Sequence, residues 1–181
     1  MYGIDDRKGE LKMNKLIKKI ACAVMAFTLI AGVFTGCKTN KSAKTTIAMP
    51  NYTSVKDPSG NLPEKGTVGD MEYRILKKGE LGSYNTSRGY YFDMVDELNA
   101  PLLIVICAGT HKAVDAEIKI VDVGMDGSTL VIVVDESKGS GEKNKELDCP
   151  TCTLEVDHEP SDLLIVTTAG EKFEKVNPYE G

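Results

Sequence analysis

The chain has 181 residues, with 22 basic and 27 acidic side chains and a formal net charge of −5 at neutral pH. An acidic chain without a basic stripe lacks the electrostatic attraction to phosphates on which nucleic-acid binding depends, so this class of function is excluded. The length accommodates one domain with additional segments.

An export signal is predicted near the N-terminus. Three lysines form a positive segment within residues 13–19, and the 15 residues 20–34 that follow carry no charge. A positive start, a short apolar middle and small residues at the end are the layout of a secretory signal peptide. The apolar run is shorter than the ~20 residues that a membrane-spanning helix needs. We therefore expect residues 13–36 to be a signal peptide.

The signal ends in Phe34-Thr35-Gly36-Cys37, which resembles a bacterial lipobox. In such a site the cysteine thiol takes a diacylglycerol, and the chain is cut between Gly36 and Cys37. We expect the mature protein to be attached to the extracytoplasmic side of the cell membrane by acyl chains on Cys37, since two or more chains give stable anchoring. An ordinary signal anchor with an incidental cysteine is the alternative. Removal of residues 1–36 leaves 16 basic and 24 acidic residues, a formal charge of −8.

The twelve residues before Met13 are unusual in front of a signal peptide. Codons for Lys8-Gly9-Glu10 accommodate a purine-rich bacterial ribosome-binding site a short distance upstream of Met13. We expect translation to start at Met13 and residues 1–12 to be an upstream extension that the translated protein lacks.

Residues 37–69 are expected to form a flexible tether. Beyond the cysteine they are rich in Lys, Thr, Ser, Asn, Pro and Gly, and they show no sustained apolar period. Such a composition is typical of a linker rather than of a packed element. The tether would carry the globular domain, residues 70–181.

The globular domain is predicted to be mainly β, because short apolar or β-branched runs recur between turn residues. Strands are expected within residues 71–78, 88–94, 101–109, 117–123, 129–135, 151–156, 162–168 and 171–176, with a short helical turn at 93–98, a hairpin loop at 124–128 and a solvated loop at 137–148. About seven strands with at most one short helix predict an antiparallel β-sandwich or partly closed barrel. The expected core residues are Leu102, Ile104, Ile106, Ile118, Ile120, Leu130, Ile132, Val134, Leu163, Ile165 and Phe173.

The order of these elements resembles the PrcB family of bacterial lipoproteins. The resemblance covers roughly residues 70–176 and rests on the runs MEYRILKK, PLLIVICAG, EIKIVDV and TLVIVVDE, followed by Cys149-Pro150 and a last apolar strand. The family's namesake is a subunit of a surface protease complex, so the resemblance implies a protein partner of this kind. The family has a glycine and then a Thr-Gly-Gly-Tyr-like turn after the third strand. Here Gly109 is present, but Val114-Asp115-Ala116-Glu117 replaces the Gly-Gly-Tyr element.

No catalytic constellation is predicted in the globular domain. His111 and His158 lie in turns without a recognisable partner, and we interpret both as exposed loop histidines. The domain has no phosphate-cradling glycine loop and no His-Glu-x-x-His pair. We expect a protein that is not an enzyme and that has no cofactor and no metal site.

The cysteines divide into groups with different expected roles. Cys22 would leave with the signal, and Cys107 lies in an apolar run as a buried small residue. Cys149 and Cys152 form a C-x-x-C on an exported chain, for which we expect a local disulfide, with two unpaired thiols as the alternative. A strand follows the pair, so the helix of a thioredoxin-like motif is missing, and a zinc site would need two more ligands.

Two functions follow as hypotheses. The first is a lipid-anchored, non-enzymatic binding or accessory protein that stabilises or restrains a surface or secreted protease complex. Its contact surface would comprise edge strands and the loops at 79–90, 110–116 and 137–148. The alternative is a thiol-active surface protein that works through Cys149 and Cys152.

Overall fold

The computed structural model describes residues 44–77, 87–94, 100–141 and 143–179. The predicted extension, the predicted signal peptide and Cys37 lie outside the described residues, as do most of the residues predicted to form a helical turn. The described residues form eleven strands and no helix, and therefore no helix that could span a membrane.

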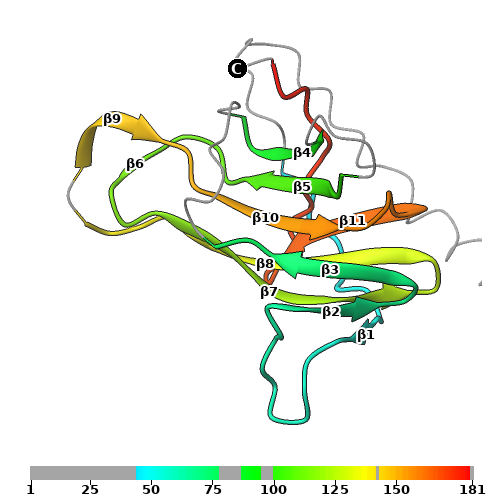
Figure 1. Ribbon diagram of the computed structural model, residues 1–181. Helices are drawn as coiled ribbons and strands as arrows, with labels where there is room; N and C mark the ends of the chain where they lie inside the picture. The colour runs from blue at the N-terminus through cyan, green and yellow to red at the C-terminus, as the bar shows by residue number, and fades with distance from the viewer. Residues whose placement is uncertain (1–43, 78–86, 95–99, 142, 180–181) are drawn as a thin grey trace, which may run out of the picture. The chain divides into compact units, whose positions relative to one another are not determined.

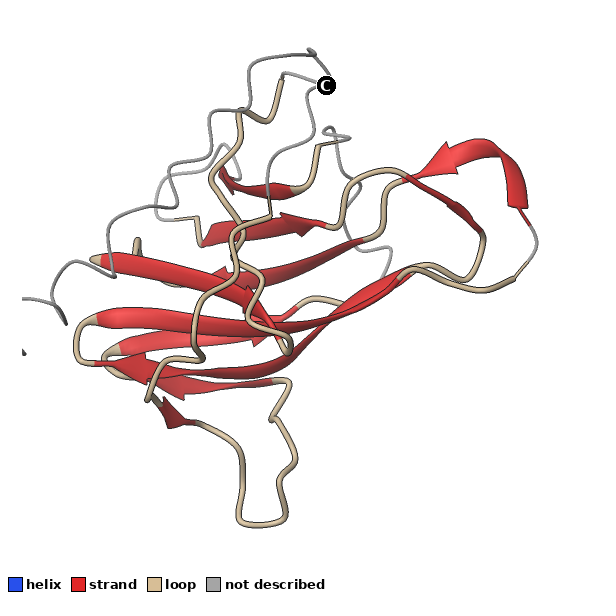
Figure 2. Ribbon diagram, turned by 180° about the vertical axis from the view of Figure 1, so that it is seen from behind, coloured by secondary structure: helices blue, strands red, loops and turns tan. Residues whose placement is uncertain are grey.

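Two sheets face each other as a β-sandwich (Figure 1, Figure 2). The first has the order β1-β7-β8-β11, with β1 Thr53–Ser54, β7 Glu117–Asp126, β8 Thr129–Ser137 and β11 Asp162–Thr167. The second has the order β2-β3-β10-β5-β4, with β2 Lys65–Val68, β3 Met71–Ile75, β10 Thr151–Val156, β5 Leu102–Cys107 and β4 Gly89–Met94. A separate pair consists of β6 His111–Ala113 and β9 Lys143–Asp148. The predicted sandwich is confirmed, and its two large sheets do not join into one closed sheet.

Seven of the predicted strands are present, as β3, β4, β5, β7, β8, β10 and β11. The sequence does not predict β1, β2, β6 and β9, because the first three are short and β9, KNKELD, is polar without apolar alternation. The sandwich is also not wholly antiparallel, since β11 pairs with β8 in parallel register from Asp162↔Thr129 to Thr167↔Val134. The chain reaches β11 from β10 in the other sheet rather than through a hairpin, so the connection does not force an antiparallel pair.

The core follows the two-residue period of the strands. In β5, Ile104 and Ile106 point between the sheets, whereas Leu103, Val105 and Cys107 belong to a second cluster on the outer face. This strand is therefore buried on both faces, as its continuous apolar sequence predicts. All of the predicted core residues belong to the cluster between the sheets, so that prediction is confirmed.

A β-bulge in β7 changes which of its side chains face the core. Ile120 pairs with Val134 of β8, and Asp122 pairs with the adjacent Val133, so Val121 is the extra residue. An extra residue shifts the following side chains to the opposite face. Asp122 consequently lies outside the sandwich core, although the uninterrupted alternation would have put it inside. The hairpin turn beyond is also shorter than predicted, because β7 continues to Asp126.

Residues 44–69 are part of the folded domain, so the prediction of a flexible tether over residues 37–69 is wrong from residue 44 onward. Ile47 and Tyr52 pack on an apolar patch of β8 and β11 on the outer face of the four-stranded sheet. Val55 and Leu62 pack against the core between the sheets. These apolar side chains are isolated in sequence and show no period, which is why the sequence pattern does not reveal them.

Asp122 holds this N-terminal segment against β7. Its carboxylate accepts hydrogen bonds from the Tyr52 hydroxyl at 2.9 Å and from the Ser54 hydroxyl at 2.6 Å. Ser54 also pairs with Gly124 of β7, where a side chain would collide with a carbonyl oxygen of β1. The bulge and this glycine together create the site at which the segment docks.

Residues 171–176 form no strand, contrary to the prediction, but they connect the edges of the two sheets. The Phe173 amide donates to the Ile165 carbonyl of β11 at 2.9 Å. The Tyr90 amide of β4 donates to the Glu174 carbonyl at 3.0 Å, and the Val176 amide donates to the Tyr90 carbonyl at 2.8 Å. Residue 173 bonds to β11, whereas residues 174 and 176 bond to β4, so the segment makes too few consecutive hydrogen bonds with either strand to extend its sheet. It covers the edges of β4 and β11, which would otherwise be open to pairing with another chain.

Arg88 links the two sheets at the same side of the sandwich. Its guanidinium lies 3.1 Å from one carboxylate oxygen of Glu136 in β8 and 3.2 Å from the other. It also donates to the Lys172 carbonyl at 3.1 Å and lies 3.8 Å from the centroid of the Phe173 ring. The Arg88 and Glu136 side chains are only 15% and 16% exposed. A bidentate pair shielded in this way is stronger than an exposed ion pair.

Replacement of Tyr52 by phenylalanine tests the docking of the N-terminal segment. Tyr52→Phe removes one hydrogen bond to Asp122, and we expect a loss of about 1 kcal/mol in the free energy of unfolding at pH 7. Burial, the hydrogen bond and the charge of Asp122 raise the pKa of Tyr52 from 10.0 to about 12. Because the folded state holds the phenol proton more tightly, its contribution is complete below pH 10 and is lost as the pH rises toward 12.

The measurement is urea unfolding of the wild type and of Tyr52→Phe between pH 7 and pH 12. We expect the difference between the two proteins to shrink over the upper part of this range. The control is Tyr179→Phe, since Tyr179 is 88% exposed and should leave the curve unchanged. Identical wild-type and Tyr52→Phe curves across the range would contradict the docking role.

Candidate functional site

Two of the segments predicted to form a contact surface come together in a two-stranded arm. β6 and β9 pair antiparallel, with His111 opposite Asp148 and Ala113 opposite Lys143. Both views show this arm extending beyond the end of the two large sheets (Figure 1, Figure 2). The predicted loop at 110–116 is thus partly strand, and the solvated loop predicted at 137–148 is instead a strand over residues 143–148.

The arm is continuous with both sheets of the sandwich. β6 follows β5 of the five-stranded sheet and leads into β7 of the four-stranded sheet, and β9 makes the reverse crossing from β8 to β10. At the root of the arm on the five-stranded sheet, where β5 leads into β6 and β9 leads into β10, Cys107 pairs with Thr151. The Ala108 amide also donates to the Pro150 carbonyl there, at 3.0 Å. At the root on the four-stranded sheet, where β6 leads into β7 and β8 leads into β9, Glu117 pairs with Ser137. The arm therefore extends from strands of both sheets rather than from a single loop.

Asp115 fixes the chain beside the arm. Its carboxylate accepts hydrogen bonds from the backbone amides of Ser140 and Gly141, each at 2.9 Å. These hydrogen bonds lower the pKa of Asp115. Asp115 follows β6 within the segment Val114-Asp115-Ala116-Glu117. The sequence does not predict this role, although Lys138-Gly139-Ser140-Gly141 is typical of a turn that offers exposed backbone amides.

Val114 is the main apolar group that the described part of the arm presents to solvent. Its side chain is 59% exposed, which makes it one of three large hydrophobic side chains among the described residues that are exposed. Lys112 and Asp115 on either side of it are also exposed. An exposed apolar residue with charged neighbours on a projecting ribbon is compatible with contact to another protein.

The sheet edges differ in their accessibility. Among the described strands, β4 and β11 are covered by residues 171–176, whereas β2 pairs only with β3. A groove of about 590 Å³ lies beside β2, with Lys65, Arg74 and Glu155 among its lining residues. Arg74 and Glu155 form a bidentate ion pair with contacts of 3.1 and 2.8 Å. The predicted contact loop at 79–90 lies mostly outside the described residues.

The two histidines have separate surroundings. His111 begins β6 and is half-buried, with Nε2 3.4 Å from the Ala108 carbonyl oxygen, so it is not the exposed loop histidine that the sequence predicts. His158 is exposed in the turn after β10, with Nδ1 2.9 Å from a carboxylate oxygen of Asp157. Over the described ranges, no three His, Cys, Asp or Glu side chains are grouped so that they could hold a metal ion.

Cys149 and Cys152 do not face each other, so the predicted disulfide between them is not supported by their placement. Cys152 lies on the inner side of β10, packs against the core and lines a small cavity with Ile118 and Ile120 of β7. Cys149 packs instead with Cys107 in the outer-face cluster. No disulfide joins any pair of the three cysteines that lie in the described residues.

Neither thiol of the C-x-x-C has the properties of an activated nucleophile. A hydrogen bond with Cys107, together with burial, raises the pKa of Cys149. Burial, with a smaller effect of Glu136, raises the pKa of Cys152. Reactive cysteines have a lowered pKa instead. This arrangement does not favour the alternative hypothesis of a thiol-active pair.

No family model, curated protein or solved structure matches the chain.

The hydrogen bonds of Asp115 lead to a prediction about the arm. Asp115→Ala removes the acceptor of the Ser140 and Gly141 amides, so we expect faster amide exchange there and along β6 and β9. The lowered pKa means that the interaction is complete above pH 3.8 and is lost as the pH falls through the pKa of the folded protein. Hydrogen exchange with mass spectrometry measures the effect.

Asp126→Ala is the matched control, because Asp126 is an exposed aspartate at the opposite end of β7. It should leave exchange in the arm unchanged. Equal exchange in the arm of Asp115→Ala and the wild type would show that Asp115 does not hold it.

Proposed function

We propose that this protein is a lipid-anchored, extracytoplasmic and non-enzymatic binding or accessory protein that presents the β6–β9 arm to a protein partner. The arm supports this proposal most directly. Two segments that lie some thirty residues apart in the sequence pair outside the sandwich, and none of the side chains described in them belongs to the core between the sheets. The pairing shifts register between His111 and Ala113, but the two paired segments still restrain each other, so the ribbon loses less conformational entropy on binding than an unpaired loop.

The anchor rests on the lipobox-like sequence that ends at Cys37. Because residue 44 already belongs to the folded domain, the proposed anchor and the domain are separated by only six residues. This connection reaches at most about 25 Å. The arm would therefore act close to the membrane surface, on a partner that is itself attached to the membrane or recruited to it.

The class of partner follows from the resemblance to the PrcB family. We propose a surface or secreted protease complex, which the protein would stabilise or restrain. The departure from the family pattern at Val114-Asp115-Ala116-Glu117 lies directly beside the arm. The partner would accordingly differ from that of the family's namesake at the surface that contacts this element.

Site-specific photo-cross-linking in the native host tests the contact surface. A photoreactive amino acid replaces Val114 in one variant and Ser128 in a control variant. Ser128 is also exposed, but it lies in the β7–β8 turn at the far end of the sandwich. We expect one surface or secreted protein to be cross-linked in high yield from position 114 and not from position 128.

A cross-link from position 128 alone, or none from either position, would overturn the proposed role of the arm. Identification of the cross-linked protein by mass spectrometry decides its class. A protease or a subunit of a protease complex supports the accessory function, and a protein of another class contradicts that part of the proposal.

The anchor has an independent test. Cys37→Ala removes the thiol that would be acylated, so the protein should lose incorporation of labelled fatty acid and should no longer form a processed membrane-bound product. Cys107→Ala is unsuitable as a control because Cys107 is buried, so Cys149→Ala serves instead. Unchanged fatty-acid labelling of Cys37→Ala would exclude Cys37 as the site.

A further inference from the structure

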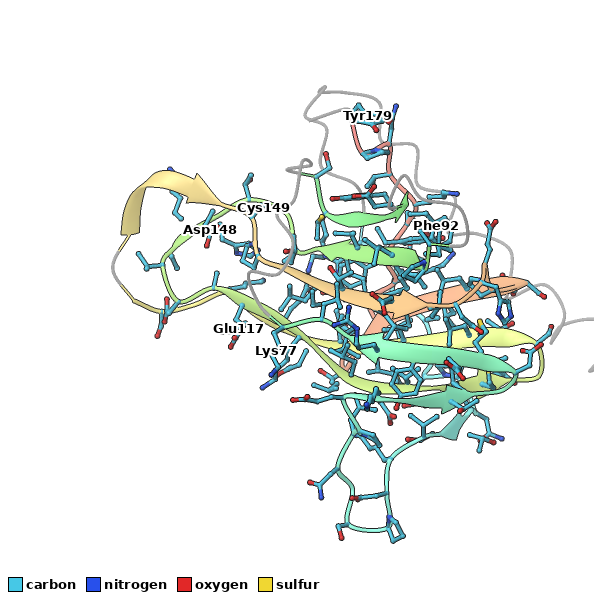
Figure 3. All side chains as sticks on the ribbon, viewed as in Figure 1. Lys77, Phe92, Glu117, Asp148, Cys149 and Tyr179 are labelled. Atoms are coloured by element: carbon cyan, nitrogen blue, oxygen red, sulfur yellow. The ribbon has the colours of Figure 1, made fainter. Side chains whose placement is uncertain are left out.

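Cys107 and Cys149 lie together at the root of the β6–β9 arm. Cys107 is the last residue of β5, where the chain leaves the five-stranded sheet toward β6. Cys149 follows β9 directly and precedes β10, where the chain returns to the same sheet. Figure 3 shows Cys149 beside Asp148 at this junction. The two cysteines therefore lie on the two chain segments that connect the arm to the five-stranded sheet.

Their side chains are on the same face and in contact. Both belong to the outer-face cluster, and their thiols are in hydrogen-bonding contact. The Gly109 amide also donates to the Cys149 sulfur. Gly109 has φ +83°, a left-handed conformation that glycine adopts without strain, and it follows Cys107 by two residues. The turn thus places the Gly109 amide, in the β5–β6 connection, against the sulfur of Cys149 in the β9–β10 connection.

The sequence pattern favours a different pair, and the alternation of β10 excludes it. Cys152 shares the inner side of β10 with Leu154 and Val156, whereas Cys149 lies with Cys107 on the outer side. A disulfide needs sulfurs about 2.05 Å apart and side chains that point toward each other. Cys149 meets this directional requirement with Cys107 and not with Cys152.

We propose that Cys107 and Cys149 form a disulfide that clamps the root of the arm. In an extracytoplasmic setting a small-molecule disulfide R–S–S–R serves as the oxidant. Cys149 attacks it first, since Cys107 is buried and Cys149 is the more accessible of the two thiols. The attack is slow because the pKa of Cys149 is raised, and one R–SH leaves. Cys107 then displaces the second R–SH from Cys149. Two thiol protons and two electrons pass to the oxidant, which yields two R–SH, while one sulfur–sulfur bond forms in the protein.

The disulfide would restrain the arm in the absence of any partner, so the inference goes beyond the proposed function and rests on one part of it, the extracytoplasmic location. Pairing of Cys107 with Thr151 and the hydrogen bond from Ala108 to Pro150 already hold the two segments in register. A covalent link adjacent to these contacts limits the separation of β5 from β10. It would therefore keep β6 and β9 in one orientation relative to the five-stranded sheet.

Disulfide mapping of the full-length protein tests the proposal. The protein is incubated with oxidised glutathione at pH 8.5, remaining thiols are alkylated, and the trypsin digest is analysed without reduction. We expect a cross-linked species that joins peptide 89–112, which contains Cys107, to peptide 146–172, which contains both Cys149 and Cys152. The cross-linked species should persist in Cys152→Ser and disappear in Cys149→Ser.

A second measurement does not depend on a substitution. Oxidation should raise the Tm of the wild type by roughly 5 °C or more, because the link closes a loop of about 40 residues, and dithiothreitol should reverse the increase. Cys152→Ser should show the same reversible increase. A Cys149–Cys152 link would overturn the proposal, and so would glutathione retained on Cys149 or recovery of Cys107 and Cys149 as thiols after oxidation.

Discussion

The alternation of side chains along β5 and β10 is the constraint on which the rest of the structure depends. These neighbouring strands lie at the centre of the five-stranded sheet, and each sends every second residue into the core between the sheets. In β5 the remaining residues are also apolar, so side chains from outside the sheet, among them Leu76 and Val176, pack on its outer face. The same alternation assigns Cys152 to the core and Cys107 to the outer face. One geometrical property thus determines the packing of the sheet and the pairing available to its cysteines.

The outer faces and edges of the sandwich are covered by the two ends of the domain. The N-terminal segment lies on the four-stranded sheet, where the bulge at Val121 turns Asp122 outward to receive Tyr52 and Ser54. Residues 171–176 cover an edge of each sheet, and Arg88 adds an ion pair between them. Edges covered in this way do not recruit further strands, whereas the described arm, β2 and the short β1 each pair on one side only.

The arm differs from the sandwich in what stabilises it. The contacts described for it are backbone pairing and the hydrogen bonds of Asp115 to Ser140 and Gly141, whereas the sandwich has a large apolar core. An element with little buried apolar surface opens more readily than a core strand. Restraint at its root by Cys107 and Cys149 would compensate for this without hiding the exposed Val114. The arm could then keep a defined orientation and still present its surface to a partner.

The sequence by itself determined the fold class, seven strands and the core between the sheets, because a two-residue apolar period reports directly on which face of a strand is buried. It also predicts a signal peptide and a lipobox, which lie outside the described residues. Only the tertiary structure decided that residues 44–69 are folded, that β6 pairs with β9, and that Cys149 contacts Cys107. Each of these depends on a partner distant in the chain. Ile47 and Tyr52 need the apolar patch of β8 and β11, and the polar strand β9 needs β6. The contact of Cys149 with Cys107 needs the register between β5 and β10. Local sequence cannot encode such a partner, because the contact exists only once the sheets have assembled.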